Sequence, residues 1–260
     1  METKPRSRVV LLGASNLTLA FRLVVARLRA ALPAPLGILA AIGHGRSYGR
    51  TSRMLARELP GITECGLWRA LDRTPEDETD GATCALLTDF GNDIVYGADV
   101  DAIAGWIETA LERLARHRAR CALVRLPLRT FERVSPLRFW MARGILYPSH
   151  RIAFARVRER ARALDARIVE LARAHGAALV EQREDWYGVD PVHIRRRRRD
   201  AAWREILAPL EACGRAQPAR ALERAALGRL LPERRRFLGR DEVHAQPAAE
   251  LLDGTTISVY

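Results

Sequence analysis

The sequence RVVLLGASNL, residues 8–17, contains the features from which the fold of this chain is predicted. Its first half is a short apolar run that ends at Gly13, which is typical of a strand buried on both faces of a parallel sheet. Apolar residues then recur at helical spacing as far as Leu32, and Pro33 ends the helix that this spacing predicts. A buried strand that leads through glycine into a helix is the first half of a β-α-β unit.

The same alternation of strand and helix continues along the chain. Further apolar runs predict strands at residues 36–42, 83–88, 121–126 and 177–180. Helical patterns predict helices at residues 17–32, 100–116, 151–175 and 196–212. Strands that alternate with helices predict a mainly parallel sheet covered on both faces, which is a three-layer α/β/α sandwich.

Two segments do not follow this alternation. Residues 127–150 hold several aromatic side chains, among them Phe139 and Trp140, without clean periodicity, and we expect either a lid over a site or a packed excursion. The chain after residue 213 combines a helical pattern at residues 219–231 with a polar tail. We therefore expect one main domain over residues 1–213 and an extension over residues 214–260 that is partly helical or disordered.

Length and composition limit the class of protein further. A chain of 260 residues is long enough to bury a large core without disulfides, and its four cysteines are scattered and form no C-x-x-C pair. Residues 1–8 are polar, and the apolar run that follows is too short for a signal-peptide core or a membrane span. We expect a cytoplasmic protein with no membrane span.

The chain carries a formal charge of +12, which in principle favours nucleic acid or anionic lipid as a partner. Lys4 is the only lysine, so arginine accounts for the other 42 basic residues. These arginines are spread along the chain and are not interleaved with aromatic residues in one segment. We interpret the charge as a surface bias toward arginine, and nucleic acid as an unlikely partner.

Polar clusters follow four of the five predicted strands, at the edge of the sheet where open parallel sheets bind ligands. The clusters are Gly13 to Asn16, Gly43 to Ser47, Gly91 to Asp93 and Asp190 to His193. Each has a simple structural interpretation by itself, such as a helix N-cap at Ser15 or a turn at Asn92. Together they hold a hydroxyl, an imidazole, a carboxylate and hydrogen-bond donors, which are the groups that nucleophilic acyl transfer requires.

In order and rough spacing, the four clusters resemble the sequence blocks of the SGNH/GDSL hydrolase family over about residues 8–212. The resemblance implies a flavodoxin-like α/β/α fold and hydrolysis of a small-molecule ester without a cofactor or metal. Because members of the family cleave lipid, acetyl-sugar, thioester and aryl ester bonds, it leaves the acyl group open. One departure is Ala14, which stands where the first block of the family usually has an aspartate.

The resemblance also implies roles for individual residues. Ser15 corresponds to the nucleophile, His193 to the general base and Asp190 to the carboxylate that orients the histidine. The oxyanion hole would use the N–H groups of Ser15 and Gly45 and the side-chain amide of Asn92.

Further residues near these blocks are candidates for substrate contacts. They are Arg46, Tyr48, Trp186 and Tyr187, with core packing as the alternative for the aromatic side chains. The arginine run at residues 195–199 predicts either a solvated helix start or an anion-selective pocket mouth. For the whole protein, two alternatives to an esterase stay open: a catalytically silent binding domain, motivated by Ala14, and an acyltransferase that uses the same serine.

Overall fold

The computed structural model describes residues 7–73, 82–133, 153–188, 190–212, 227–228 and 230–260. The strands are β1 (Ser7–Leu12), β2 (Leu36–Ala41), β3 (Ser52–Met54), β4 (Arg57–Leu59), β5 (Thr83–Leu87), β6 (Arg120–Val124), β7 (Ala178–Val180), β8 (Arg234–Phe237), β9 (Arg240–Val243), β10 (Ala249–Glu250) and β11 (Thr256–Val259). The α-helices are α1 (Ser15–Ala31), α2 (Leu67–Arg73), α3 (Gly91–Val95), α4 (Val100–Arg116), α5 (Leu128–Arg133), α7 (Phe154–Ala174) and α8 (Arg199–Glu211). Short 3-10 turns lie at η1 (Ile62–Glu64), η3 (Glu184–Trp186) and η4 (Arg196–Arg198).

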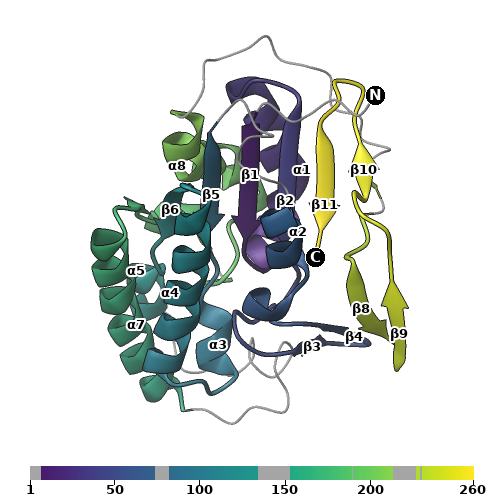
Figure 1. Cartoon of the computed structure of the whole chain (residues 1–260). Helices are drawn as coiled ribbons and strands as arrows, with labels where there is room; N and C mark the ends of the chain where they lie inside the picture. The colour runs from purple at the N-terminus through teal and green to yellow at the C-terminus, as the bar shows by residue number, and fades with distance from the viewer. Residues whose placement is uncertain (1–6, 74–81, 134–152, 189, 213–226, 229) are drawn as a thin grey trace.

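The main sheet has seven strands in the order β10-β11-β2-β1-β5-β6-β7 (Figure 1). All neighbouring pairs from β11 to β7 are parallel, and only β10 runs antiparallel to its neighbour. The chain moves from β1 to β2 on one side and then returns to β5 on the other. The carboxyl ends of β1 and β5 therefore lie at a topological switch point, where open α/β sheets bind ligands.

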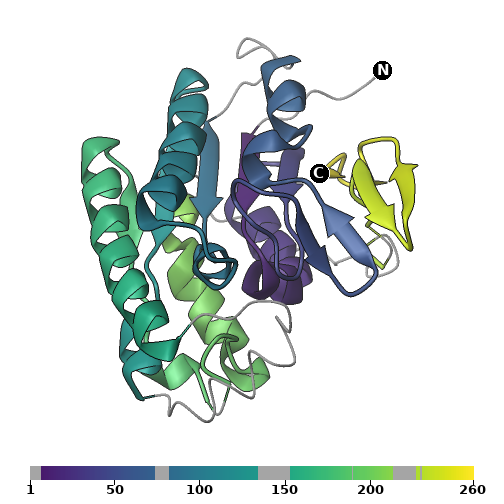
Figure 2. The same cartoon turned by 90° about the horizontal axis from the view of Figure 1, so that it is seen from below.

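Strand β1 contributes to the core on both sides of the sheet because its side chains alternate. Val9 and Leu11 pack in the cluster that includes α1 and α8, whereas Val10 and Leu12 pack in the cluster that includes α2, α4 and α7. All four are fully buried. Figures 1 and 2 show helices on both sides of the sheet, which confirms the predicted α/β/α sandwich with a mainly parallel sheet.

The C-terminal part of the chain differs from the expected extension. Its helical pattern at residues 219–231 lies mostly outside the described residues. Four strands, β8 to β11, lie between residues 234 and 259. β11 pairs in parallel with β2, with Ile257 opposite Ile38, and Ile257 is fully buried in the core. The apolar alternation of residues 256–259 is too short to be recognised without the neighbouring strand, so the sequence analysis missed this strand.

A second, smaller sheet of four antiparallel strands has the order β3-β4-β8-β9. It joins two hairpins that are far apart in the sequence, because β4 pairs with β8 and places Arg57 opposite Phe237. Figure 2 shows both hairpins beside the main sheet. The predicted lid or excursion over residues 127–150 lies largely outside the described residues.

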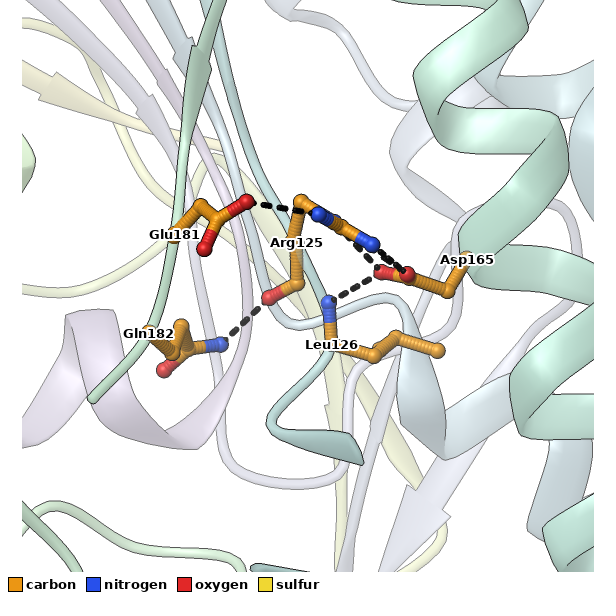
Figure 3. Close-up of polar contacts among 5 residues, drawn as sticks. All are labelled: Arg125, Leu126, Asp165, Glu181 and Gln182. Carbon is orange, nitrogen blue, oxygen red and sulfur yellow. Dashed lines mark hydrogen bonds and ion pairs between the residues drawn. The ribbon is translucent and has the colours of Figure 1, made fainter. Parts of the chain in front are cut away.

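A polar network joins the middle of α7 to the ends of β6 and β7 (Figure 3). Arg125 donates to the buried carboxylate of Asp165 at 2.5 Å and to Glu181 at 2.7 Å. The Leu126 N–H donates to Asp165 at 3.0 Å, and the Gln182 amide donates to the Arg125 carbonyl at 2.6 Å. These bonds fix the edge of the sheet at which the candidate site lies.

Within the described part of the chain, we find no helix that combines the length and the apolar composition required to span a bilayer.

Candidate active site

A cavity of about 610 Å³ lies where the loops after β1, β2, β5 and β7 meet. Its walls include Ser15, Gly45, Asn92 and His193, which are four of the five residues predicted to form the triad and oxyanion hole. The fifth, Asp190, contacts His193 directly. The structure thus brings together side chains that are separated by as much as 178 positions in the sequence.

Ser15 is the first residue of α1, and its N–H lies among the unpaired donors of a helix start. The first turn of α1 contains no acidic residue, but Asp89, from the end of β5, supplies a carboxylate in space. Asp89 accepts hydrogen bonds from the N–H groups of Ala14 at 2.9 Å and Leu17 at 3.2 Å. Within the described residues, the Ser15 N–H and Oγ have no hydrogen-bond partner.

His193 and Asp190 form a hydrogen bond of 2.7 Å between Nδ1 and Oδ2. The other carboxylate oxygen of Asp190 accepts from the N–H groups of Val192 and His193. Burial by itself would raise the pKa of Asp190, but these hydrogen bonds outweigh it and lower the pKa. Asp190 is therefore held as a carboxylate that faces His193. No hydrogen bond joins Ser15 to His193 in this arrangement.

Asn16 holds the loop that carries His193 against the start of α1. Its amide nitrogen donates to the Val192 carbonyl at 2.9 Å, and its amide oxygen accepts from the Ile194 N–H at 2.9 Å. The same nitrogen also donates to Asp89 at 3.0 Å. Asn16 therefore bonds to the residues on both sides of His193, which fixes the position of the imidazole relative to the neighbouring Ser15.

Three side chains hold successive carbonyl groups in the loop after β2. Arg57 donates to the His44 carbonyl at 3.1 Å, Tyr96 donates to the Gly45 carbonyl at 2.5 Å, and Asn92 donates to the Arg46 carbonyl at 3.2 Å. Because a trans peptide is planar, fixing the His44 carbonyl also fixes the opposed N–H of Gly45. That N–H has no acceptor among the described residues.

Gly45 itself cannot be replaced without strain. It has a φ of +65°, which is in the left-handed region, and a Cβ atom there would lie 2.6 Å from the Met54 methyl group. The loop conformation that fixes the Gly45 N–H therefore requires a glycine.

His44 lines the same cavity, beside His193. Its pKa is lowered, first by burial and then by the positive charge of Arg57. It is a histidine of the loop after β2 and has no assigned role in the predicted triad.

The first two residues predicted to contact substrate, Arg46 and Tyr48, lie in the core and not in the cavity wall. Both are fully buried. Arg46 donates to the carbonyl groups of Ile42 and Pro60 and to that of Tyr260. The Tyr48 hydroxyl donates to the carbonyls at the ends of β1 and β5. These partners give both side chains a structural role.

Trp186 and Tyr187 are also buried, and neither lines the cavity. The arginine run at residues 195–199 begins η4 and α8, and none of its members lines the cavity. Arg195, for example, donates to the Asp185 carbonyl at 2.9 Å. Its interpretation as a helix start fits the structure.

Besides Leu19 of α1, sequence reasoning missed five residues of the cavity wall that lie on two hairpins: Met54, Leu55, Ala56, Arg57 and Phe237. These five belong to the strands and the β3–β4 turn of the second sheet, whose short strands give too few residues for a recognisable period. In the described part of the chain, no group of three His, Cys, Asp or Glu side chains is arranged to hold a metal ion.

Solved structures that share this architecture identify the class of fold. The chain shares with solved esterase structures an α/β fold in which a mostly parallel sheet is flanked by helices, as the resemblance described above implies. At the level of sequence, no protein-family model and no curated protein matches the chain.

Two of the similar structures show how close the likeness is. The carbohydrate acetylesterase Est24 from Sinorhizobium meliloti has a TM-score of 0.52 at 16% identity, covering 79% of this chain and 99% of Est24. The M. smegmatis aryl esterase has a TM-score of 0.51 at 12% identity, covering 79% of this chain and 97% of the esterase. At such low identity the likeness concerns the fold, and the chemistry has to be argued from the site.

Proposed function

We propose that this protein is a serine hydrolase that cleaves a carboxylic ester, with Ser15, His193 and Asp190 as its triad. The observation that carries the proposal is the 2.7 Å hydrogen bond between His193 and Asp190 at a cavity that Ser15 also lines. A serine at a helix start, next to an imidazole oriented by a carboxylate, is the arrangement that nucleophilic acyl transfer requires. The similar structures, a carbohydrate acetylesterase and an aryl esterase, favour a small ester as substrate.

In the first half of the reaction, Ser15 Oγ attacks the ester carbonyl carbon while His193 Nε2 takes the hydroxyl proton. The carbonyl π bond opens, and its electron pair moves to the oxygen. When the carbonyl reforms, the bond to the leaving alcohol breaks and His193 gives its proton to that alcohol. In the second half, His193 takes a proton from a water molecule as the water oxygen bonds to the acyl carbon. The bond from that carbon to Ser15 Oγ then breaks, His193 returns the proton to Oγ, and the acid is released.

The negative oxygen that forms in each half needs donors that are already in place. The N–H groups of Ser15 and Gly45 and the amide of Asn92 are assigned to this role. The two backbone donors have no acceptor among the described residues, and the Gly45 N–H is fixed through the His44 carbonyl. Asn92 is held by its bond to the Arg46 carbonyl.

Asp190 fixes the tautomer of His193. Its hydrogen bond to Nδ1 leaves Nε2 as the nitrogen that receives the proton of Ser15. The lowered pKa of Asp190 keeps it ionised over the pH range in which the histidine works, so it stabilises the imidazolium that forms.

The test is the rate of hydrolysis of p-nitrophenyl acetate by purified variants. Ser15→Ala and His193→Ala are expected to lower kcat roughly 10⁴-fold or more, and Asp190→Asn by a roughly similar factor. His175→Ala, at the end of α7 and outside the cavity, is the matched control and should retain the wild-type rate. A folded wild-type protein without activity, or a Ser15→Ala variant with unchanged kcat, would contradict the proposal and favour a binding domain.

A further inference from the structure

The wall of the cavity beyond the proposed catalytic groups is apolar. The apolar lining residues are Leu19, Met54, Leu55, Ala56, Val192 and Phe237. All polar side chains of the lining belong to the proposed machinery or border it, and Arg57 donates to the loop carbonyl described above. No aspartate or glutamate is among the described residues that line the cavity. Polar atoms or a positive charge on a substrate group that contacts this wall therefore add little to its binding free energy.

Large exposed apolar side chains gather at this place. Of the seven such side chains in the described part of the chain, three line the cavity: Leu19, Leu55 and Phe237. A fourth, Leu238, lies next to them, because its N–H donates to the Ala56 carbonyl at 2.9 Å. This bond joins the turn of the β3–β4 hairpin to the turn of the β8–β9 hairpin.

Each of the two hairpin turns has a leucine in a backbone conformation that is less strained for other residues. Leu55 has a φ of +54° and Leu238 a φ of +49°, in the left-handed region that glycine and asparagine adopt more readily. Their exposed fractions are 88% and 72%, so neither leucine is explained by burial in the core. A strained and exposed apolar residue at the rim of a cavity is accounted for when a ligand covers it.

Phe237 is held in position by its neighbours in the second sheet. The Arg235 guanidinium lies 5.1 Å from the centre of the Phe237 ring and is itself bound to Glu242 at 2.6 Å. Across the sheet, Phe237 pairs with Arg57, the residue that holds the loop of Gly45. The apolar wall and the proposed oxyanion loop are therefore parts of one rigid arrangement.

From these contacts we infer that the second sheet, through Leu55 and Phe237, binds an uncharged apolar chain of the ester substrate. The inference rests on the proposed function, since it places this chain beside the scissile bond. A cavity of about 610 Å³ falls in the range of sites for small organic ligands. The apolar chain can belong either to the acyl group or to the alcohol, and the two are separated by experiment.

The test measures kcat/KM along two series of neutral esters. One is p-nitrophenyl acetate, butyrate, hexanoate and octanoate, and the other is methyl, butyl and hexyl acetate. In the series whose chain contacts the wall, kcat/KM should rise by up to about fourfold for each methylene, since burial of one methylene gives ~0.8 kcal/mol. p-Nitrophenyl hemisuccinate, which has a charged chain of similar length to butyrate, should be the poorer substrate.

The variants Leu55→Ser and Phe237→Ser should lower the preference for the longest over the shortest ester roughly tenfold, since each removes several apolar carbons from the wall. Leu252→Ser is the matched control, because Leu252 is 94% exposed and does not line the cavity. It should leave both the rates and the preference unchanged. A flat dependence on length in both series, an unchanged preference in both variants, or faster cleavage of the hemisuccinate would overturn the inference.

A separate binding measurement distinguishes failure of this inference from failure of the proposed function. The ketone 2-octanone has the shape of an ester with an apolar chain but cannot be cleaved. It should raise the Tm of Ser15→Ala, acetone should not, and the effect should be absent in Ser15→Ala with Leu55→Ser. This result in a protein that cleaves no ester would contradict the proposed function but not the apolar site. Cleavage of esters without any stabilisation by 2-octanone would contradict the apolar site but not the proposed function.

Discussion

At the scale of single residues, the proposed oxyanion hole depends on side chains that never touch the oxyanion. Arg57 holds the carbonyl end of the peptide whose other end is the Gly45 N–H. It is half-buried, it makes no ion pair among the described residues, and burial lowers its pKa. A cation without a carboxylate partner, placed on a peptide carbonyl, fixes that peptide and strengthens the dipole that points at the cavity.

Arg57→Met should therefore lower kcat roughly 10- to 100-fold, because the His44 peptide is then free to turn; complete loss of one oxyanion donor costs roughly 10²–10³. The measurement is kcat and KM for p-nitrophenyl acetate. Arg57→Lys, which keeps a donor, should recover part of the rate. Arg53→Met is the control on the neighbouring strand, since Arg53 is exposed and lies 3.7 Å from Glu58. A raised KM with unchanged kcat would instead show that Arg57 binds substrate.

At the scale of elements, the network in Figure 3 joins α7 to the ends of β6 and β7. Removing the Asp165 carboxylate leaves Arg125 and the Leu126 N–H without their buried acceptor. We expect Asp165→Ala to lower the free energy of unfolding by roughly 2–4 kcal/mol. Urea unfolding measures this difference.

Glu181→Gln is the matched control for that prediction. Glu181 bonds to the same arginine, but its side chain is largely exposed, so its loss should cost under about 1 kcal/mol. Equal effects of the two variants would contradict the role assigned to the buried carboxylate.

A second element-scale feature is the attachment of α3 to the loop after β2. Asp93 is fully buried and accepts hydrogen bonds from the Ser47 hydroxyl and the Tyr48 N–H. Burial raises the pKa of Asp93 from its ordinary value of 3.8 to about 6 and outweighs these two hydrogen bonds, which act to lower it. Because its pKa is higher in the folded state, the unfolded chain loses this proton first. The contribution of Asp93 to stability is therefore greatest below about pH 4 and is lost as the pH rises through about 6.

The stability of wild type minus that of Asp93→Asn should accordingly fall between about pH 4 and pH 6 and stay constant above that range. Urea unfolding of both proteins at each pH gives this difference, and titration of the other carboxylates cancels in it. A difference that is constant or rises over the range would show that the pKa of Asp93 is not raised.

At the scale of the whole molecule, the parallel α/β core was predictable from the sequence because its buried strands and amphipathic helices are long enough to show their periods. Gly13 to Asn16 was identifiable because this cluster directly follows a predicted strand, and Asp190 to His193 because it lies in the loop after another. The second sheet was not predictable. Its strands have three or four residues, and β4 and β8 become a sheet only when they pair across the chain.

Sequence reasoning also failed for two residues that were predicted to contact the substrate. Arg46 lies in a polar cluster after a strand, as cavity residues do, and Tyr48 lies directly after that cluster, but both side chains are buried in the core. Sequence position fixes the loop on which a residue lies and not the direction of its side chain. Phe237, which does form part of the wall, comes from a segment that sequence reasoning treated as an extension.

The most direct test of the account is the identity of the residue that reacts with a fluorophosphonate probe, which forms a stable adduct with an activated serine. The labelled protein is digested and the modified peptide is sequenced by mass spectrometry. One adduct is expected, on Ser15, and none in His193→Ala although that variant is folded. Labelling of another serine, or no labelling of folded wild-type protein, would contradict it.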